Sequence, residues 1–235
     1  VTMGLRHSRF DNTIDDLIGG TQSSQKNKAT TGMIGVTHEF ANGLTPYLSY
    51  TEGFTQNIGK TLSGDVLDPS ESTQWEAGMR YQPSADLMLS AAVFDLRKTK
   101  EYDTRDATWS SFTQTGEVRS RGIELEARGR LNEAVEGVFS YSYLDSKVSK
   151  SSDTTLVGNH NSMAPPHQVA LWFDYDAENF VQGLSVGAGV RYVSAFYATQ
   201  SNGRKTAGYA LADLSLKYEM PEMTVNLDVN NLFDK

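Results

Sequence analysis

The sequence predicts an all-β fold, an antiparallel transmembrane β-barrel, on three observations. Apolar and polar residues alternate with a period of two over long segments. These segments exceed the usual strand of about 5–6 residues and reach the roughly 9–11 that a tilted strand needs to cross a bilayer. Long polar connections alternate with very short turns, and no run approaches the ~20 consecutive apolar residues of a transmembrane helix.

The clearest pair of strands lies in residues 117–148, EVRSRGIELEARGRLNEAVEGVFSYSYLDSKV. A break at Asn132-Glu133-Ala134 divides the segment into two ribbons, which predicts a hairpin with a tight turn. Each ribbon has one apolar face, formed by Ile123, Leu125, Ala127, Gly129 and Leu131 in the first and by Val135, Gly137, Phe139, Tyr141 and Tyr143 in the second. The opposite face of the first ribbon is charged, so this hairpin is predicted to cross a membrane.

The same unit recurs before this hairpin. Expected strands cover 1–12, 33–40, 44–54, 70–82 and 86–98. Long polar loops are expected at 13–28, 55–69 and 100–108, and short turns at 41–43 and 83–85. In 70–82 Trp75 shares its phase with Ala77, Met79 and Tyr81, so it should point outward. Both phases of 86–98 carry apolar residues, which leaves the faces of that strand open.

After the hairpin the pattern continues. A strand from about residue 109 leads into it, a loop at 149–165 follows it, and further strands are expected at 166–175, 184–196, 207–219 and 224–233. The turns lie near 177–183 and 220–222, and a loop covers 198–206. Trp172 shares its phase with Gln168, Ala170 and Asp174, so it should point into the lumen.

About eleven strands result, with long loops at one end and short turns at the other, as in transmembrane barrels. Tyrosines lie near strand ends, where an aromatic girdle would place them: Tyr50, Tyr81, Tyr141, Tyr143, Tyr175, Tyr192 and Tyr218. A soluble antiparallel sandwich is the alternative, because tyrosine also favours ordinary strands. Sandwich strands are shorter, however, and their loops do not alternate in this way.

Composition limits the function. The chain has 235 residues, a net charge of −8 and no cysteine. The acidic balance argues against nucleic-acid binding, which needs a basic surface. Absence of cysteine excludes disulfides and thiolate metal ligands. No signal peptide opens the sequence, and because an exported protein needs one, the true N-terminus is expected to lie upstream.

Several segments resemble the C-terminal barrel of TonB-dependent siderophore receptors, and the resemblance covers essentially the whole chain. They occur in the order of that family: YLSYTEGFTQN (47–57), LDPSESTQWEAGMRYQ (67–82), AAVFDLRKTK (91–100), TGEVRSRGIELEARG (115–129), PPHQVALWFDY (165–175), GVRYVSAFYA (189–198) and VNNLFDK (229–235). No single motif is decisive, but the seven together are specific.

The resemblance implies that residues 1–235 are part of a 22-stranded outer-membrane barrel, whose strands 11 through 21 the chain would fit. The family's N-terminal plug domain, its short energy-coupling box and the closing strand are expected to be missing from this chain. The chain would then be roughly half of a barrel domain.

The resemblance also implies the function: import of ferric siderophores across the outer membrane of a Gram-negative bacterium, energised through the TonB complex. Iron would arrive chelated, so no cofactor and no metal ligands from the protein are expected, and the partners would be the siderophore, TonB and outer-membrane lipid. Three alternatives stay open: another substrate such as a cobalamin or an oligosaccharide, an outer-membrane hydrolase, and a passive porin.

Aromatic residues in the loops are the expected ligand contacts, because rigid aromatic rings supply contact area to bulky chelates: Tyr102, Trp109, Phe112, Phe196 and Tyr197. They could equally cap strands or belong to the girdle. The inward charges should form a polar ladder facing plug and water: Glu76, Arg80, Glu124, Glu126, Arg128, Arg191, Asp213 and Lys217. No catalytic residues are expected, since His160-Asn161-Ser162 lies in a polar loop where adjacent residues rarely build a triad.

Overall fold

The computed structural model describes residues 1–16, 21–102, 111–114 and 116–235. Eleven strands form one antiparallel sheet in the order β1-β2-β3-β5-β6-β8-β9-β10-β11-β14-β15, in which each strand pairs with its neighbour in the sequence of long strands. Their bounds are β1 Thr2–Asp16, β2 Thr21–Thr37, β3 Leu44–Thr55, β5 Ser70–Ser84, β6 Leu87–Glu101, β8 Gly116–Asn132, β9 Val135–Lys150, β10 His167–Asp176, β11 Leu184–Val193, β14 Tyr209–Glu219 and β15 Thr224–Val229.

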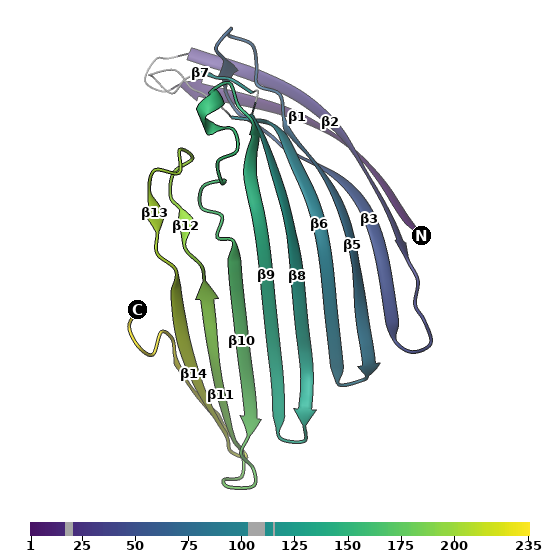
Figure 1. The fold of residues 1–235 in the computed structure, drawn as a ribbon, viewed down its shortest axis with the longest axis vertical. Helices are drawn as coiled ribbons and strands as arrows, with labels where there is room; N and C mark the ends of the chain where they lie inside the picture. The colour runs from purple at the N-terminus through teal and green to yellow at the C-terminus, as the bar shows by residue number, and fades with distance from the viewer. Residues whose placement is uncertain (17–20, 103–110, 115) are drawn as a thin grey trace.

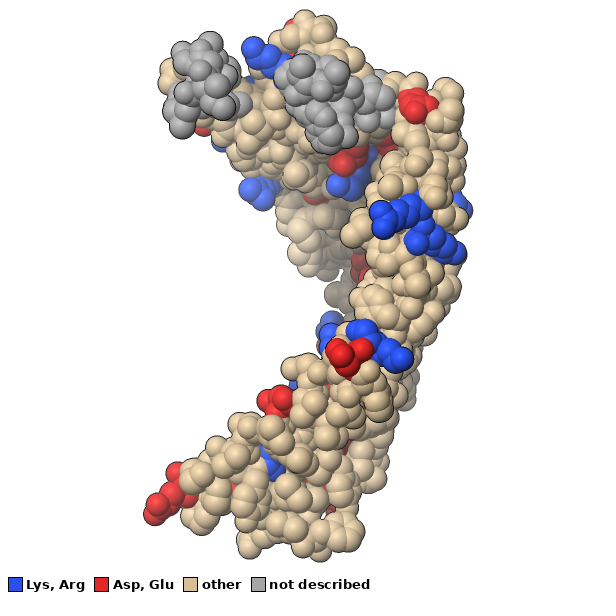
Figure 2. All heavy atoms as spheres, turned by 90° about the vertical axis from the view of Figure 1, so that its left-hand side faces the viewer, with Lys and Arg blue, Asp and Glu red and all other residues tan. Residues whose placement is uncertain are grey.

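The sheet is open and strongly curved (Figures 1 and 2). The longer connections lie at the end drawn at the top of Figure 1, called here the loop end, and the short turns lie at the other, called the turn end. At the loop end two small sheets pair β4 (Lys60–Thr61) with β7 (Ser111–Phe112) and β12 (Phe196–Tyr197) with β13 (Lys205–Thr206). Within the described residues the one helix is the 3-10 turn η1, Thr154–Leu156, and none is long and apolar enough to span a membrane.

The strand pattern of the sequence is confirmed, but one loop prediction is wrong. Residues 13–28, expected to be a loop, lie largely in β1 and β2, whose ladder runs on to the pair Asp16 and Thr21. Apart from Ile14, the described residues of this segment are polar, so it lacks the apolar alternation by which a strand is recognised. Backbone ladder hydrogen bonds require no such alternation where neither face meets a core or lipid.

The apolar faces join into continuous rows across the sheet. One row runs through Pro46, Met79, Ala91, Leu125, Tyr141, Val169, Tyr192 and Ala210. These side chains are not covered by a second layer, since Leu125 is 38% and Met79 50% exposed. Within the described residues the buried hydrophobic ones are only Leu67, Val148 and Ala177. A sandwich would bury one apolar face against another sheet, so this arrangement fits a lipid-facing wall.

Strand β6, whose faces the sequence left open, is placed by its register. Leu89, Ala91 and Val93 lie in the outward rows, whereas Phe94 lies on the polar face opposite Gly122. A side chain at Gly122 would collide with the Phe94 ring, so this glycine makes room for an inward aromatic residue. The second apolar phase of β6 is therefore part of the inner face.

Candidate functional site

The inner face of the sheet is polar and hollowed. A hollow of about 540 Å³ opens on it, and its lining combines carboxylates, hydroxyls and an arginine with four tyrosines. Its residues include Tyr47, Glu124, Glu126, Ser142, Gln168, Arg191 and Tyr209. Register places the predicted inward charges on this face, and Glu126 lies between Ser90 and Ser140 of the neighbouring strands. A polar lumen wall is what the charge pattern predicted.

Trp172 lies on the same inner face, as the sequence indicated. Its register partners are Val138 and Gly189, and a side chain at Gly189 or Gly187 would collide with its indole ring. Trp172 Nε1 donates a hydrogen bond to Asp174 Oδ2 at 2.8 Å. The glycine pair thus lets the ring lie flat along β11, while Trp75 lies in the outward phase opposite Tyr50.

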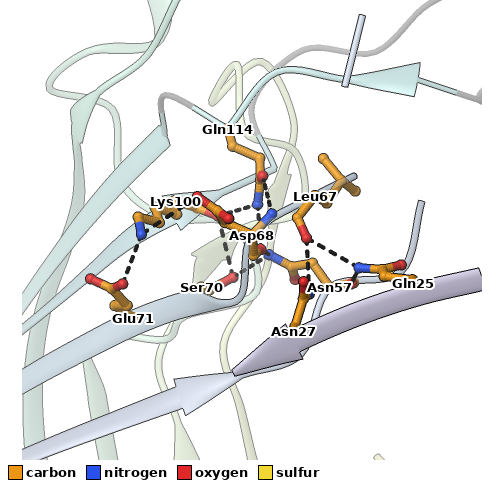
Figure 3. A network of polar contacts seen from close by, with 9 residues as sticks. All are labelled: Gln25, Asn27, Asn57, Leu67, Asp68, Ser70, Glu71, Lys100 and Gln114. Carbon is orange, nitrogen blue, oxygen red and sulfur yellow. Dashed lines mark hydrogen bonds and ion pairs between the residues drawn. The ribbon is translucent and has the colours of Figure 1, made fainter. Parts of the chain in front are cut away.

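A polar network at the loop end holds the 56–69 connection against the sheet (Figure 3). Asn57, which is 5% exposed, donates through Nδ2 to the carbonyl of Asp68 at 3.0 Å and to Ser70 Oγ at 2.8 Å. Gln114 donates to the carbonyls of Asp68 at 2.7 Å and Lys100 at 3.2 Å. One buried amide thereby anchors both ends of the connection.

The network also reaches the β1–β2 hairpin. Gln25, 3% exposed, donates through Nε2 to the carbonyls of Asn57 at 2.7 Å and Leu67 at 3.1 Å. Asn27 donates to the same Leu67 carbonyl at 3.0 Å. Pairing of β2 with β3 extends only from Thr37–Tyr47 to Met33–Thr51. Beyond that point the side chains of Gln25 and Asn27 connect the hairpin to the 56–69 connection.

Lys100 adds charge to this network. Its Nζ lies 2.7 Å from Glu71 Oε1 and 3.7 Å from Asp68 Oδ2. The hydrogen bond with Glu71 raises the pKa of Lys100 above its ordinary value. The ammonium therefore stays charged at any physiological pH, and the ion pairs persist there.

We expect Asn57→Ala to loosen the 56–69 connection, because it removes the amide that satisfies the carbonyl and hydroxyl groups around it. Losing buried hydrogen bonds costs ~1–3 kcal/mol, so exchange of the Leu67 amide hydrogen should accelerate by about tenfold or more. Hydrogen exchange of the full-length protein measures this. Asn179→Ala, an exposed change in a turn-end connection, is the matched control and should leave Leu67 unchanged. Unaltered exchange in the Asn57 variant would contradict the anchoring role.

Of the five aromatic residues predicted as ligand contacts, the structure describes the side chains of three, Tyr102, Phe196 and Tyr197. Trp109 lies outside the described residues, and Phe112 is in β7, with its side chain also outside them. Tyr102 is 45% exposed, and its hydroxyl lies 3.2 Å from the backbone nitrogen and 3.3 Å from the oxygen of Ile58. It therefore braces the 56–69 connection and also presents ring surface.

Phe196 and Tyr197 are half-buried in β12. The Tyr197 ring stacks on His160 with centroids 5.7 Å apart, and Lys205 Nζ lies 5.6 Å from the same ring centre. Asn202 clamps the two loops, since its side chain accepts from the His160 nitrogen and donates to the His160 oxygen, both at 2.8 Å. The loop after β9 and the loop after β11 thus form one unit around Tyr197.

This arrangement gives His160 a packing role, because its ring stacks on Tyr197 while its backbone is held by Asn202. Among the described residues, no group of three or more His, Asp or Glu side chains is arranged to hold a metal ion. Sequence reasoning missed Gln25, Asn57 and Asn202. Their signal is weak, because isolated amide residues in polar loops show no periodicity, and only the fold reveals which carbonyl groups they meet.

Comparison with known proteins gives a family match over residues 1–232, to the family described as TonB dependent receptor-like, beta-barrel. The ferrichrome outer membrane transporter/phage receptor of Escherichia coli K12 is 35% identical over 243 residues, covering 100% of this chain and 32% of that protein. The ferrioxamine B receptor of Salmonella typhimurium is 33% identical, covering 100% and 34%. The crystal structure of the siderophore receptor PiuA from Acinetobacter baumannii matches with a TM-score of 0.84 at 23% identity, covering 99% and 36%. The chain spans about a third of the length of the curated relatives it matches.

Proposed function

We propose, because this chain belongs to the TonB-dependent receptor β-barrel family, that the whole protein imports a ferric siderophore across the outer membrane, energised through TonB. The chain is part of an outer-membrane receptor barrel of a Gram-negative bacterium. What we propose beyond the family is the substrate, the energy source and the partners.

The observation that carries the proposal is the match of the entire chain to the ferrichrome and ferrioxamine B receptors. The fold supports the same proposal, because the inner face of the strand wall is polar, as passage of a hydrophilic chelate requires. The siderophore itself supplies the ligands of the iron, so the protein needs no cofactor and only has to recognise the surface of the chelate.

Recognition is proposed for the loop end. Tyr102, Phe196 and Tyr197, with Trp109 and Phe112, remain the candidate contacts, because aromatic rings give large contact area at a low cost in conformational entropy. The anchored connections described above would hold these rings in place. Binding needs no bond to be made or broken in the chelate, so the proposal is a transporter and not an enzyme.

Energy coupling is proposed because a large barrel with a filled lumen cannot pass a bulky chelate passively. A plug domain and an energy-coupling segment elsewhere in the whole protein would supply the gate and the TonB contact. A passive porin would instead pass solutes without an energy source.

Uptake of iron-55 by a strain lacking the full-length gene, with and without its restoration on a plasmid, tests the proposal. Ferrichrome and ferrioxamine B are the first probes, each measured with TonB present and deleted. We expect uptake of a siderophore only when both the receptor and TonB are present. Uptake independent of TonB would favour a porin, and a deletion strain impaired only for cobalamin or an oligosaccharide would move the substrate to that class.

A further inference from the structure

The ladder between β2 and β3 stops before either strand ends. Its last pair is Met33 with Thr51, although both strands continue past this pair. Each strand keeps its other neighbour there, since residues 29–32 pair with β1 and residues 52–55 pair with β5. Both facing edges are therefore already extended strand and lack only each other. A hollow of about 310 Å³ lies between them, and residues of both strands line it, among them Thr30, Thr31, Glu52, Gly53 and Phe54.

Alternate residues of the two edges point their backbone groups into this gap. The His38 nitrogen donates to the Pro46 carbonyl at 3.2 Å, so even-numbered residues of the two neighbouring segments face one another. The observed register, continued past its last pair, would form two more hydrogen-bonded pairs: Gly32 with Glu52 and Thr30 with Phe54. Each such pair exchanges two N–H···O bonds, so closing the gap offers four backbone hydrogen bonds.

Three side chains, which we call the spacer residues, hold the two edges apart: Gln25, Asn27 and Glu52. Glu52 Oε2 accepts a hydrogen bond from the Gly32 nitrogen at 2.9 Å, which its own backbone carbonyl would accept in a continued ladder. Farther along β2, Gln25 and Asn27 donate to backbone carbonyls of the 56–69 connection at 2.7, 3.1 and 3.0 Å (Figure 3). The gap is thus spanned by side chains where a ladder would join the backbones directly.

Closing the gap would exchange these bonds almost one for one. The spacer residues make four hydrogen bonds in the observed arrangement, and the continued ladder would make four backbone ones. The observed arrangement also has an edge-to-face contact between the rings of Phe10 and Phe54, whose centroids lie 5.4 Å apart. Because one set of hydrogen bonds replaces the other, the two arrangements lie close in free energy, with the observed one favoured.

We propose that the β1–β2 hairpin has a second, closed position, in which its ladder with β3 extends to Ala29 and Thr55 and the spacer residues leave the gap. Closure frees the 56–69 connection from the hairpin. The backbone nitrogen of Ile58 in this connection lies 3.2 Å from the Tyr102 hydroxyl, so closure also loosens that brace. This regulatory role rests on the proposed function, because Tyr102 is a candidate contact of the chelate.

Disulfide trapping in the full-length protein tests the closed position, since residues 1–235 contain no cysteine. Ala29 and Thr55 would form a non-hydrogen-bonded pair there, whose Cα atoms lie about 4.5 Å apart, within the range for a disulfide. We expect Ala29→Cys with Thr55→Cys to cross-link under mild oxidation, as identified by mass spectrometry of proteolytic peptides. Gly35→Cys with Ser49→Cys is the positive control, because a Cβ at Gly35 would lie 3.9 Å from Ser49 Cβ in the existing ladder.

A variant of the spacer residues shows whether the cross-link reports closure. Gln25→Ala with Asn27→Ala removes hydrogen bonds that compete with the ladder, so cross-linking between positions 29 and 55 should become about tenfold faster. Lys26→Ala is the matched control, because the ammonium of this neighbouring residue pairs with Asp11 of β1. It should leave the cross-linking rate unchanged.

Hydrogen exchange of the cross-linked protein tests the link to Tyr102 without any substrate. The Ile58 amide should exchange about threefold faster or more than in the same protein after reduction of the disulfide. Absence of the cross-link while the positive control forms, or equal rates in the spacer variant and Lys26→Ala, would overturn the closed position. Unchanged exchange at Ile58 would overturn the link to Tyr102. Failure of siderophore uptake would count against the proposed function alone, because none of these readouts uses a chelate.

Discussion

Replacing Leu125 by arginine should destabilise the full-length receptor in lipid bilayers by ~2–4 kcal/mol. Leu125 is an outward residue of β8, one row from the middle of the apolar rows, and its neighbours across the ladder are Ala91 and Tyr141. An arginine there must place its guanidinium among acyl chains or thin the bilayer around it. Reversible denaturant unfolding in vesicles, with urea or guanidinium, measures the change.

The adjacent residue supplies the matched control. Glu126 follows Leu125 in the chain but points to the inner face, between Ser90 and Ser140. Glu126→Arg exchanges one charge for another on a face that is already polar, so its cost should be clearly smaller. Equal costs for the two changes, or a larger one for Glu126→Arg, would mean that the assignment of lipid and lumen faces is reversed.

The alternation that assigns these faces can be recognised in the sequence because the lipid-facing side chains have to be apolar. Between Ile123 and Leu131 every second side chain must be apolar, so the strand, its register partner and its faces could all be predicted. Residues 13–28 show where this source of information ends. The described residues of this range, 13–16 and 21–28, are paired in a ladder but are almost all polar, so no apolar alternation distinguishes a strand from a loop.

Two other features depended on neighbours that a single sequence does not reveal. The inward position of Phe94 follows from the space above Gly122, a residue of another strand. The anchoring amides Gln25 and Asn57 contact carbonyl groups 11 to 43 residues away. The aromatic residues were predicted as ligand contacts only because they are aromatic residues in expected loops. The stacking of Tyr197 on His160 could not be predicted in this way, because it depends on how two loops distant in the sequence pack together.

The two edge strands of the sheet, β1 and β15, should make the isolated chain prone to aggregation. β1 pairs only with β2, and β15 pairs only with β14, so among the described residues each has one side without a partner strand. On such a side about half of the backbone N–H and C=O groups of the strand point outward. In hydrocarbon each unsatisfied group costs several kcal/mol, and in water such an edge pairs with other chains.

Residues 1–235 refolded alone into detergent should therefore give aggregates or a distribution of oligomers, whereas the full-length protein gives one monomeric species. Size-exclusion chromatography with light scattering measures this, and thermal unfolding followed by circular dichroism shows whether any folded fraction melts cooperatively. Eleven strands could escape the cost only by curling until β1 and β15 pair with each other, which would require a narrower barrel than the open curvature seen here. A monodisperse monomer with a sharp transition would establish that closure, and the wall described here would then be one of two states open to the chain.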